Sequence, residues 1–228
     1  IGLTFLLFAC GTVNVKKSDI NYGSRLTVLS NVADEISFKV RGLTIFERYE
    51  NEYIALDDWG LSQKLYEEIE KRVAPNPRFN VQPFYNKDVE LFRHNNGSMT
   101  LEFWEVEAND KKVIDYCKKN DTDYLLIIQP RVGAVESALL ITQASIFGSN
   151  TSGILEIGVY TIFYDCITGK QIDFDRASVK EEIEIEEWVT IDASDSELKV
   201  MDKKDYLVTK FIGTAIDSLK TVQVLDIK

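Results

Sequence analysis

Side chains able to act as nucleophiles, general bases or soft metal ligands are few in this 228-residue chain. The only histidine is His94, in the segment FRHNNGS, which is predicted to be an exposed loop. Catalysis of the Ser-His-Asp or Cys-His kind needs a base with a pKa near neutrality, and His94 is a poor candidate for it. The cysteines, Cys10, Cys117 and Cys166, form no CxxC pair, so a Cys/His zinc site at the usual spacings cannot form. We expect no enzyme activity, no metal and no cofactor.

Carboxylates are abundant, and the segment KEEIEIEEW arranges some of them in a pattern. A strand here places Glu182, Glu184 and Glu186 on one face, with Ile183 and Ile185 on the other. The ordinary interpretation is a half-exposed strand. The alternatives are a docking stripe for a basic partner or a weak Ca²⁺ site. We keep the three glutamates as candidate partner-binding residues.

Cys117 and Cys166 are far apart in sequence and sit in segments with apolar neighbours. We expect two buried free thiols, because unpaired cysteine is one of the most buried residue types. A disulfide between them is the alternative in an oxidising compartment.

Cys10 ends an apolar run, and residues 5–12 read FLLFACGT. Leu7-Phe8-Ala9-Cys10 resembles the lipobox of bacterial lipoproteins, which implies diacylglycerol and palmitate-type acylation at Cys10. We expect residues 1–9 to be a signal peptide truncated at its start, and residues 10–24 a lipidated linker. Two or three acyl chains anchor a protein stably. Gly11 favours the outer membrane by the same resemblance, with the domain facing the periplasm. The alternative is a buried first strand or helix.

The composition is that of a folded domain, with 45% apolar and 28% charged residues, and we assign residues 25–228 to it. A net charge of −11 repels phosphate backbones, so we expect no nucleic-acid partner. No internal run approaches the roughly 18–20 apolar residues of a membrane-spanning helix.

The hydrophobic pattern predicts an α/β fold in which helices pack on a mixed sheet. Asp57 or Asp58 is expected to cap the first helix, and Thr168-Gly169-Lys170 to form a hairpin turn. We expect the core to include Leu65, Ile69, Leu126, Ile128, Val159, Phe163, Phe211 and Leu219. Strands are predicted at 27–31, 35–50, 78–85 and 121–132, and a hairpin over 154–186. Helices are predicted at 57–73, 107–120 and 205–219, with a short helix and loop at 86–98.

The longest stretch not required by this core is 134–153. Its apolar side chains stand beside a Gly/Ser/Asn turn, and exposed apolar groups tend to mark interaction sites. We therefore expect a partner or a neighbouring subunit to contact Leu139, Leu140, Ile141, Ile146 and Phe147. The alternatives are a hairpin lying over the domain edge and a membrane pore hairpin.

Asp123-Tyr124, Asp165 with the Thr168–Lys170 turn, and the strand RFNVQPF carry a resemblance over roughly residues 36–222. They are similar to the αβ domain shared by the TolB amino-terminal domain, the curli secretion channel CsgG and the penicillin-binding-protein activator LpoB. The resemblance implies no catalytic residue, because this family has none in common. It implies a lipid-anchored envelope adaptor that binds an unknown envelope protein, with an oligomeric outer-membrane secretion channel as the alternative. An oligomer is possible on either reading.

Overall fold

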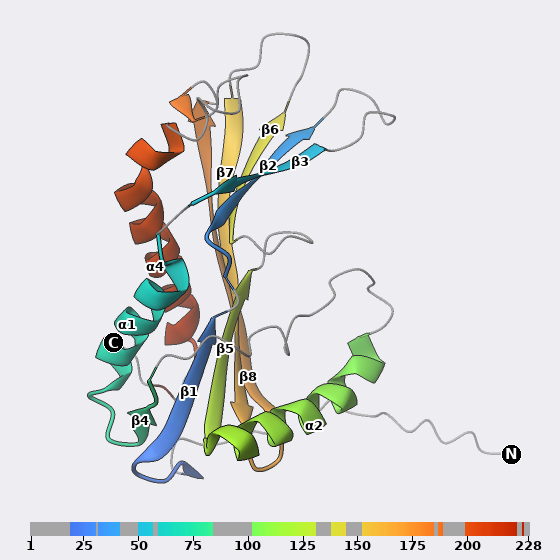
Figure 1. The fold of residues 1–228 in the computed structure, drawn as a ribbon, viewed down its shortest axis with the longest axis vertical. Coiled ribbons are helices and arrows are strands. Elements are labelled where there is room, and N and C mark those ends of the chain that lie inside the picture. The colour runs from blue at the N-terminus through green and yellow to red at the C-terminus, as the bar shows by residue number, and fades with distance from the viewer. Residues whose placement is uncertain are drawn as a thin grey trace, which may run out of the picture.

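A computed structural model gives the fold of the chain (Figure 1). Its description covers residues 19–30, 32–41, 50–56, 59–83, 102–130, 138–144, 152–184, 187–188, 199–222 and 225. The predicted mixed α/β fold is confirmed, since these residues form one mixed eight-stranded sheet with helices packed on it.

The sheet is built around one long ribbon made of β7 and β8. Its order is β3-β2-β6-β7-β5-β1-β4, and β8 pairs with the other side of β7. The strands are β1 (Ser24–Ser30), β2 (Glu35–Arg41), β3 (Glu50–Ala55), β4 (Phe79–Val81), β5 (Tyr124–Pro130), β6 (Leu139–Ala144), β7 (Ser152–Asp165) and β8 (Gln171–Glu184).

Two groups of strands share the same side of β7. Strand β7 has two antiparallel partners on this side. Its residues Gly153–Ile157 pair with β6, and its residues Val159–Asp165 pair with β5. Strands β2, β3 and β6 form an upper wing, and β1, β4 and β5 form a lower wing (Figure 1). The β7–β8 ribbon holds the two wings together, because it runs the length of both.

The turn between β7 and β8 is the one that the sequence predicts. Gly169 has φ +70°, a backbone conformation that glycine adopts without steric cost. Asp165 organises the turn with its side chain, which accepts hydrogen bonds from the Ile167 backbone N–H (2.9 Å) and the Thr168 hydroxyl (2.8 Å). The Gly169 backbone N–H donates to the Asp165 carbonyl oxygen at 2.8 Å. The turn is therefore held by its own side chains.

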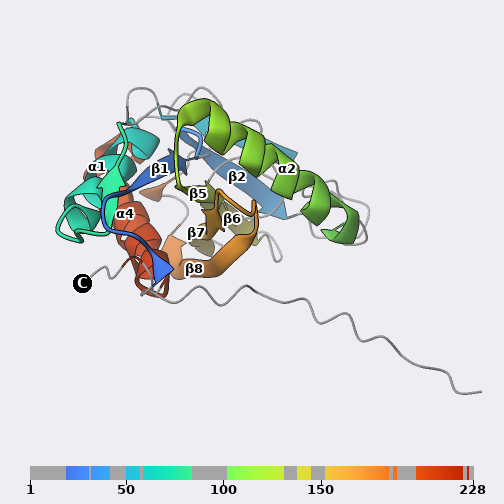
Figure 2. The same ribbon diagram turned by 90° about the horizontal axis from the view of Figure 1, so that it is seen from below.

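Helices α1 (Leu61–Val73) and α4 (Lys204–Lys220) cover one face of the sheet, and α2 (Glu102–Asn120) covers the other face at the lower wing (Figure 2). Helix α2 begins at Glu102, whereas the sequence pattern predicts a start at Glu107. The fully buried side chains include the whole predicted core set, which is confirmed: Leu65, Ile69, Leu126, Ile128, Val159, Phe163, Phe211 and Leu219.

The start of α1 differs from the prediction. The helix begins at Leu61 after Gly60, whose φ is +60°. Its first N–H groups are capped from a distant residue: the Asp34 carboxylate accepts from Leu61 N–H at 2.7 Å and from Gly60 N–H at 3.1 Å. Asp34 lies between β1 and β2, so its role depends on tertiary structure. Asp57 and Asp58, the predicted caps, lie outside the described residues.

Candidate functional site

The chain enters the described fold at Asp19, and Cys10 lies outside the described residues. Ile20 is already part of the core, with 1% of its surface exposed. The Arg78 guanidinium fixes it by donating a hydrogen bond of 2.6 Å to the Ile20 carbonyl oxygen. The hydrophobic core therefore includes a residue that precedes residue 25.

A disulfide joins Cys117 to Cys166, with the two Cα atoms 5.6 Å apart. The prediction of two free thiols is wrong. Both residues are buried beside the α2 face of the sheet. The pairing follows from the register of β5 on β7, which places Tyr124 opposite Asp165 and hence Cys166 beside the end of α2. The Cys166 N–H donates to the Asp123 carbonyl oxygen at 3.1 Å, which confirms this proximity.

Arg25 of β1 and Asp123, the residue before β5, join the beginnings of these two strands. The Asp123 carboxylate accepts from the Arg25 backbone N–H at 2.8 Å and from its guanidinium at 3.2 and 3.3 Å. Asp121 pairs with the same guanidinium. The hydrogen bond from Arg25 lowers the pKa of Asp123, against partial burial, which acts in the opposite direction. These contacts tie the beginning of β1 to the beginning of β5, which indicates a structural role.

The hairpin predicted to be an exposed partner site is partly core. Leu139 and Ile141 are fully buried, so the expectation that they form an exposed surface is wrong. The reason is that β6 lies between β2, parallel to it, and β7, antiparallel to it. Leu140 lies in the same strand with a side chain that is not described, and Ile146 and Phe147 lie outside the described residues.

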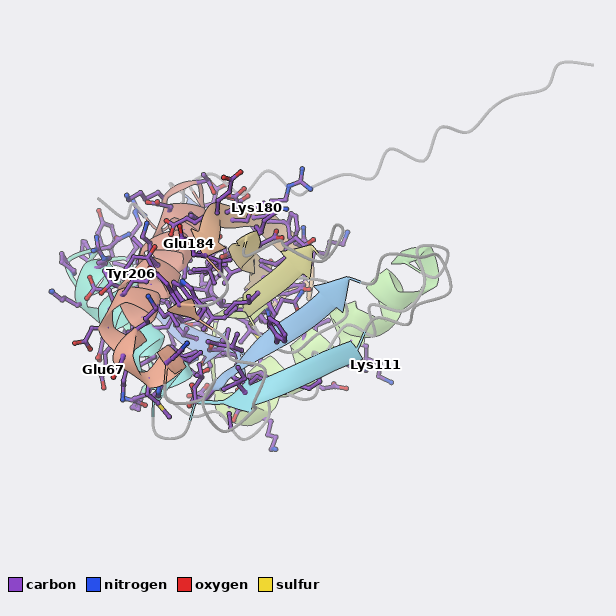
Figure 3. All side chains as sticks on the ribbon, turned by 90° about the horizontal axis from the view of Figure 1, so that it is seen from above. Glu67, Lys111, Lys180, Glu184 and Tyr206 are labelled. Atoms are coloured by element: carbon purple, nitrogen blue, oxygen red, sulfur yellow. A yellow bond between two sulfur atoms is a disulfide. The ribbon has the colours of Figure 1, made fainter. Side chains whose placement is uncertain are left out.

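The acidic stripe has the predicted alternation over the residues that the structure describes. Glu182 and Glu184 are exposed and Ile183 is buried between them. Glu182 is opposite Ile154 of β7, an isoleucine with 44% of its surface exposed. Glu186 lies outside the described residues. Figure 3 shows Lys180, Glu184 and Tyr206 along the same side of the molecule.

Glu181, next to Glu182 in the sequence, contacts a helix instead of pointing outward with the acidic stripe. It points to α4, where its carboxylate accepts hydrogen bonds from the Lys210 ammonium and the Tyr206 hydroxyl. The hydrogen bond from Lys210 lowers the pKa of Glu181. This contact joins β8 to α4 and leaves Glu182 and Glu184 as the outward-facing acidic groups.

The described residues contain no group of three or more His, Cys, Asp or Glu side chains placed to hold a metal ion. His94 lies in a segment that is not described. No helix among the described ones is both long enough and apolar enough to cross a membrane.

A shallow pocket lies at the lower end of the sheet, where β1 and β5 begin. Its lining includes Tyr22, Gly23, Asp123, Tyr124 and Ile167. Its volume is about 190 Å³, below the roughly 300–1,000 Å³ of typical small-molecule sites. The geometry favours a surface contact there over an enclosed ligand.

No protein-family model and no curated protein matches the chain. Among solved structures, it is similar to the LpoB C-terminal domain from Salmonella enterica, at 12% identity over 71% of this chain and 86% of that one, with a TM-score of 0.27. It is also similar to lipoprotein GNA1162 from Neisseria meningitidis, at 10% identity over 82% and 99% of the two chains, with a TM-score of 0.30. A PelC dodecamer from Paraburkholderia phytofirmans matches at 8% identity over 80% and 86%, with a TM-score of 0.28. The fold assignment rests on the sheet and helices described above.

Proposed function

We propose that the chain is a lipid-anchored protein of the bacterial cell envelope whose folded domain binds a protein partner and catalyses no reaction. The observation that carries the proposal is the Cys117–Cys166 disulfide. Disulfides persist in oxidising compartments such as the periplasm and are rare in the cytosol of most organisms. A chain exported for lipidation at Cys10 reaches such a compartment.

The cysteine count supports the same assignment. The chain has three cysteines, and the disulfide uses Cys117 and Cys166. Cys10 is therefore the thiol left for acylation, and it is the one that follows the lipobox-like Leu7-Phe8-Ala9. A diacylglycerol thioether at Cys10 with an acylated amino terminus supplies two or three chains, which is enough for stable anchoring. Gly11 after the cysteine favours the outer membrane, with the domain in the periplasm.

The partner surface that we propose is the upper end of the β7–β8 ribbon. Ile154, Glu182 and Glu184 are exposed there on neighbouring strands. An apolar group beside outward carboxylates suits a partner with a basic, partly apolar surface. The candidate partner-binding residues also include four that lie near this region in the sequence: Leu140, Ile146, Phe147 and Glu186.

Labelling with a fatty-acid analogue in growing cells tests the anchor. The wild-type chain should carry the label and sediment with membranes, and Cys10→Ser should abolish both. The matched control is Cys117→Ser with Cys166→Ser, which should stay labelled. A label that survives Cys10→Ser would contradict the proposal. Crosslinking from the native envelope, compared between wild type and Glu182→Lys with Glu184→Lys, should then show loss of the partner from the variant.

A subunit of an oligomeric secretion channel is the second candidate, favoured by one observation. Strand β8 is 14 residues long and, among the described residues, pairs on one side only, with β7. A strand edge of this kind is a template for pairing with another chain. Size measurement in detergent separates the candidates, because a channel must form a large ring and an adaptor need not.

A further inference from the structure

The two most exposed large hydrophobic side chains of the described part of the chain lie together. Ile167 is 85% exposed and Tyr22 is 73% exposed, and both line the shallow pocket at the lower end of the sheet. The other exposed hydrophobic residues of the described part are less exposed, the next being Tyr53 at 52%. Exposed apolar groups gathered at one place mark a contact surface.

Defined contacts fix the backbone at Ile167 and the ring of Tyr22. Ile167 is part of the β7–β8 turn, where its N–H donates to the Asp165 carboxylate. The ring of Tyr22 lies under the Arg78 guanidinium, 4.8 Å from its centroid. The next residue, Gly23, has φ +75° and donates its N–H to the Pro77 carbonyl oxygen at 3.0 Å. The apolar pair is therefore a built feature of the surface.

The position of this pair relative to the chain's amino-terminal segment identifies what covers it. Tyr22 is three residues after Asp19, where the described fold begins, and Cys10 is nine residues before Asp19. A nine-residue tether spans at most about 30 Å even when fully extended. Acyl chains on Cys10 would hold this end of the domain close to the bilayer surface.

The chemistry of the surface suits a phospholipid headgroup layer. Tyrosine is enriched at membrane interfaces, where its ring is apolar and its hydroxyl is wet. Arg78 beside it and Lys170 in the turn are cations that can meet lipid phosphates. However, Asp121, Asp123 and Asp165 lie at the same end, so the apolar pair is the main source of attraction. The last turn of α2, which is basic, lies at the same end of the sheet (Figure 1).

We propose that this end of the domain rests on the phospholipid bilayer, with Tyr22 and Ile167 inserted among the headgroups; the inference rests on the proposed lipid attachment at Cys10. Contact between this end and the bilayer would set the orientation of the whole molecule. Glu182 lies twelve residues beyond Lys170 along β8, which is about 40 Å of strand. The acidic upper end is thereby presented away from the membrane.

The test uses the lipidated full chain on vesicles of phosphatidylethanolamine and phosphatidylglycerol. An environment-sensitive fluorescent amino acid replaces Ile167 in one sample and Ile154 in the other. The probe at 167 should shift its emission to the blue and be quenched by spin-labelled lipid, whereas the probe at 154 should do neither. A probe at 167 that stays in water while the chain sediments with vesicles overturns the orientation and leaves the anchor intact. A chain that carries no lipid overturns both proposals.

Hydrogen exchange on the same vesicles supplies a second readout with a matched control. Wild type should show slower exchange of the 19–25 and 165–171 amides on vesicles than the unlipidated Cys10→Ser chain in solution. Tyr22→Ser with Ile167→Ser should lose this protection. Tyr53→Ser with Ile154→Ser removes the same residue types from β3 and from the upper end of β7 and should keep this protection. Equal protection in both double variants would overturn the proposal.

Discussion

At the residue scale, the polar side chains of this domain fix strand positions. Arg25 and Asp123 connect the beginnings of the parallel strands β1 and β5, and Asp165 shapes the turn that follows β7. Asp123 and Asp165 belong to the motifs by which the sequence resembles the TolB, CsgG and LpoB domains. Their contacts give a structural reason for aspartate at those positions.

Asp123 gives a prediction for the pH dependence of stability. Its pKa is lowered in the folded state, so its contribution is fully present above the unfolded-state pKa of about 3.9 and is lost as pH falls through the folded-state value. Asp123→Asn should therefore lower the free energy of unfolding by up to about 1 kcal/mol at pH 7, after allowing for solvent screening. Urea unfolding should show that the difference shrinks in acid.

The control for this prediction is Asp202→Asn, which removes an exposed carboxylate elsewhere. It should change the unfolding free energy little at either pH. A difference between wild type and Asp123→Asn that stays constant down to low pH would show that charge on Asp123 does not stabilise the fold.

At the scale of elements, hydrophobic periodicity predicted which segments are helices and which are strands. It did not predict which strands pair with one another. The helix predicted at 57–73 is present as α1, and the strand predicted at 121–132 is present as β5, whose residues Leu125–Pro130 are all buried. Leu139 and Ile141 were expected to be exposed because nothing in the sequence shows that β6 inserts between β2 and β7. Pairing between strands separated by many residues leaves no local signal.

The cap of α1 shows the same limit and can be tested. Asp34 accepts from the N–H groups of Gly60 and Leu61, which have no partner within the helix. Asp34→Ala should cost about 1 kcal/mol of stability, a typical value for loss of a capping side chain. Thermal or urea unfolding measures it. Asp58→Ala, at the cap expected from the sequence, is the comparison and should cost less; a reversed order would restore the prediction made from the sequence.

At the scale of the whole molecule, the β7–β8 ribbon pairs with both wings, and buried residues of the two wings belong to one hydrophobic core. Helix α4 packs along this ribbon, with Phe211 and Leu219 buried against the sheet. The disulfide ties α2 to the lower end of the same ribbon. The ribbon therefore connects the candidate membrane-facing end to the candidate partner-facing end. This connection keeps the two ends in a fixed relative orientation.

The disulfide gives the prediction that reports on the compartment as well as the fold. It closes a loop of 49 residues, and the chain-entropy model then gives a stabilisation of about 4 kcal/mol. Dithiothreitol should therefore lower the urea midpoint of the wild-type chain, because the reduced unfolded state gains conformational freedom. Cys10→Ser should keep this sensitivity, and Cys117→Ser with Cys166→Ser should lose it. Chain recovered from cells under thiol-blocking conditions should carry the Cys117–Cys166 bond; two free thiols there would remove the main support for export to an oxidising compartment.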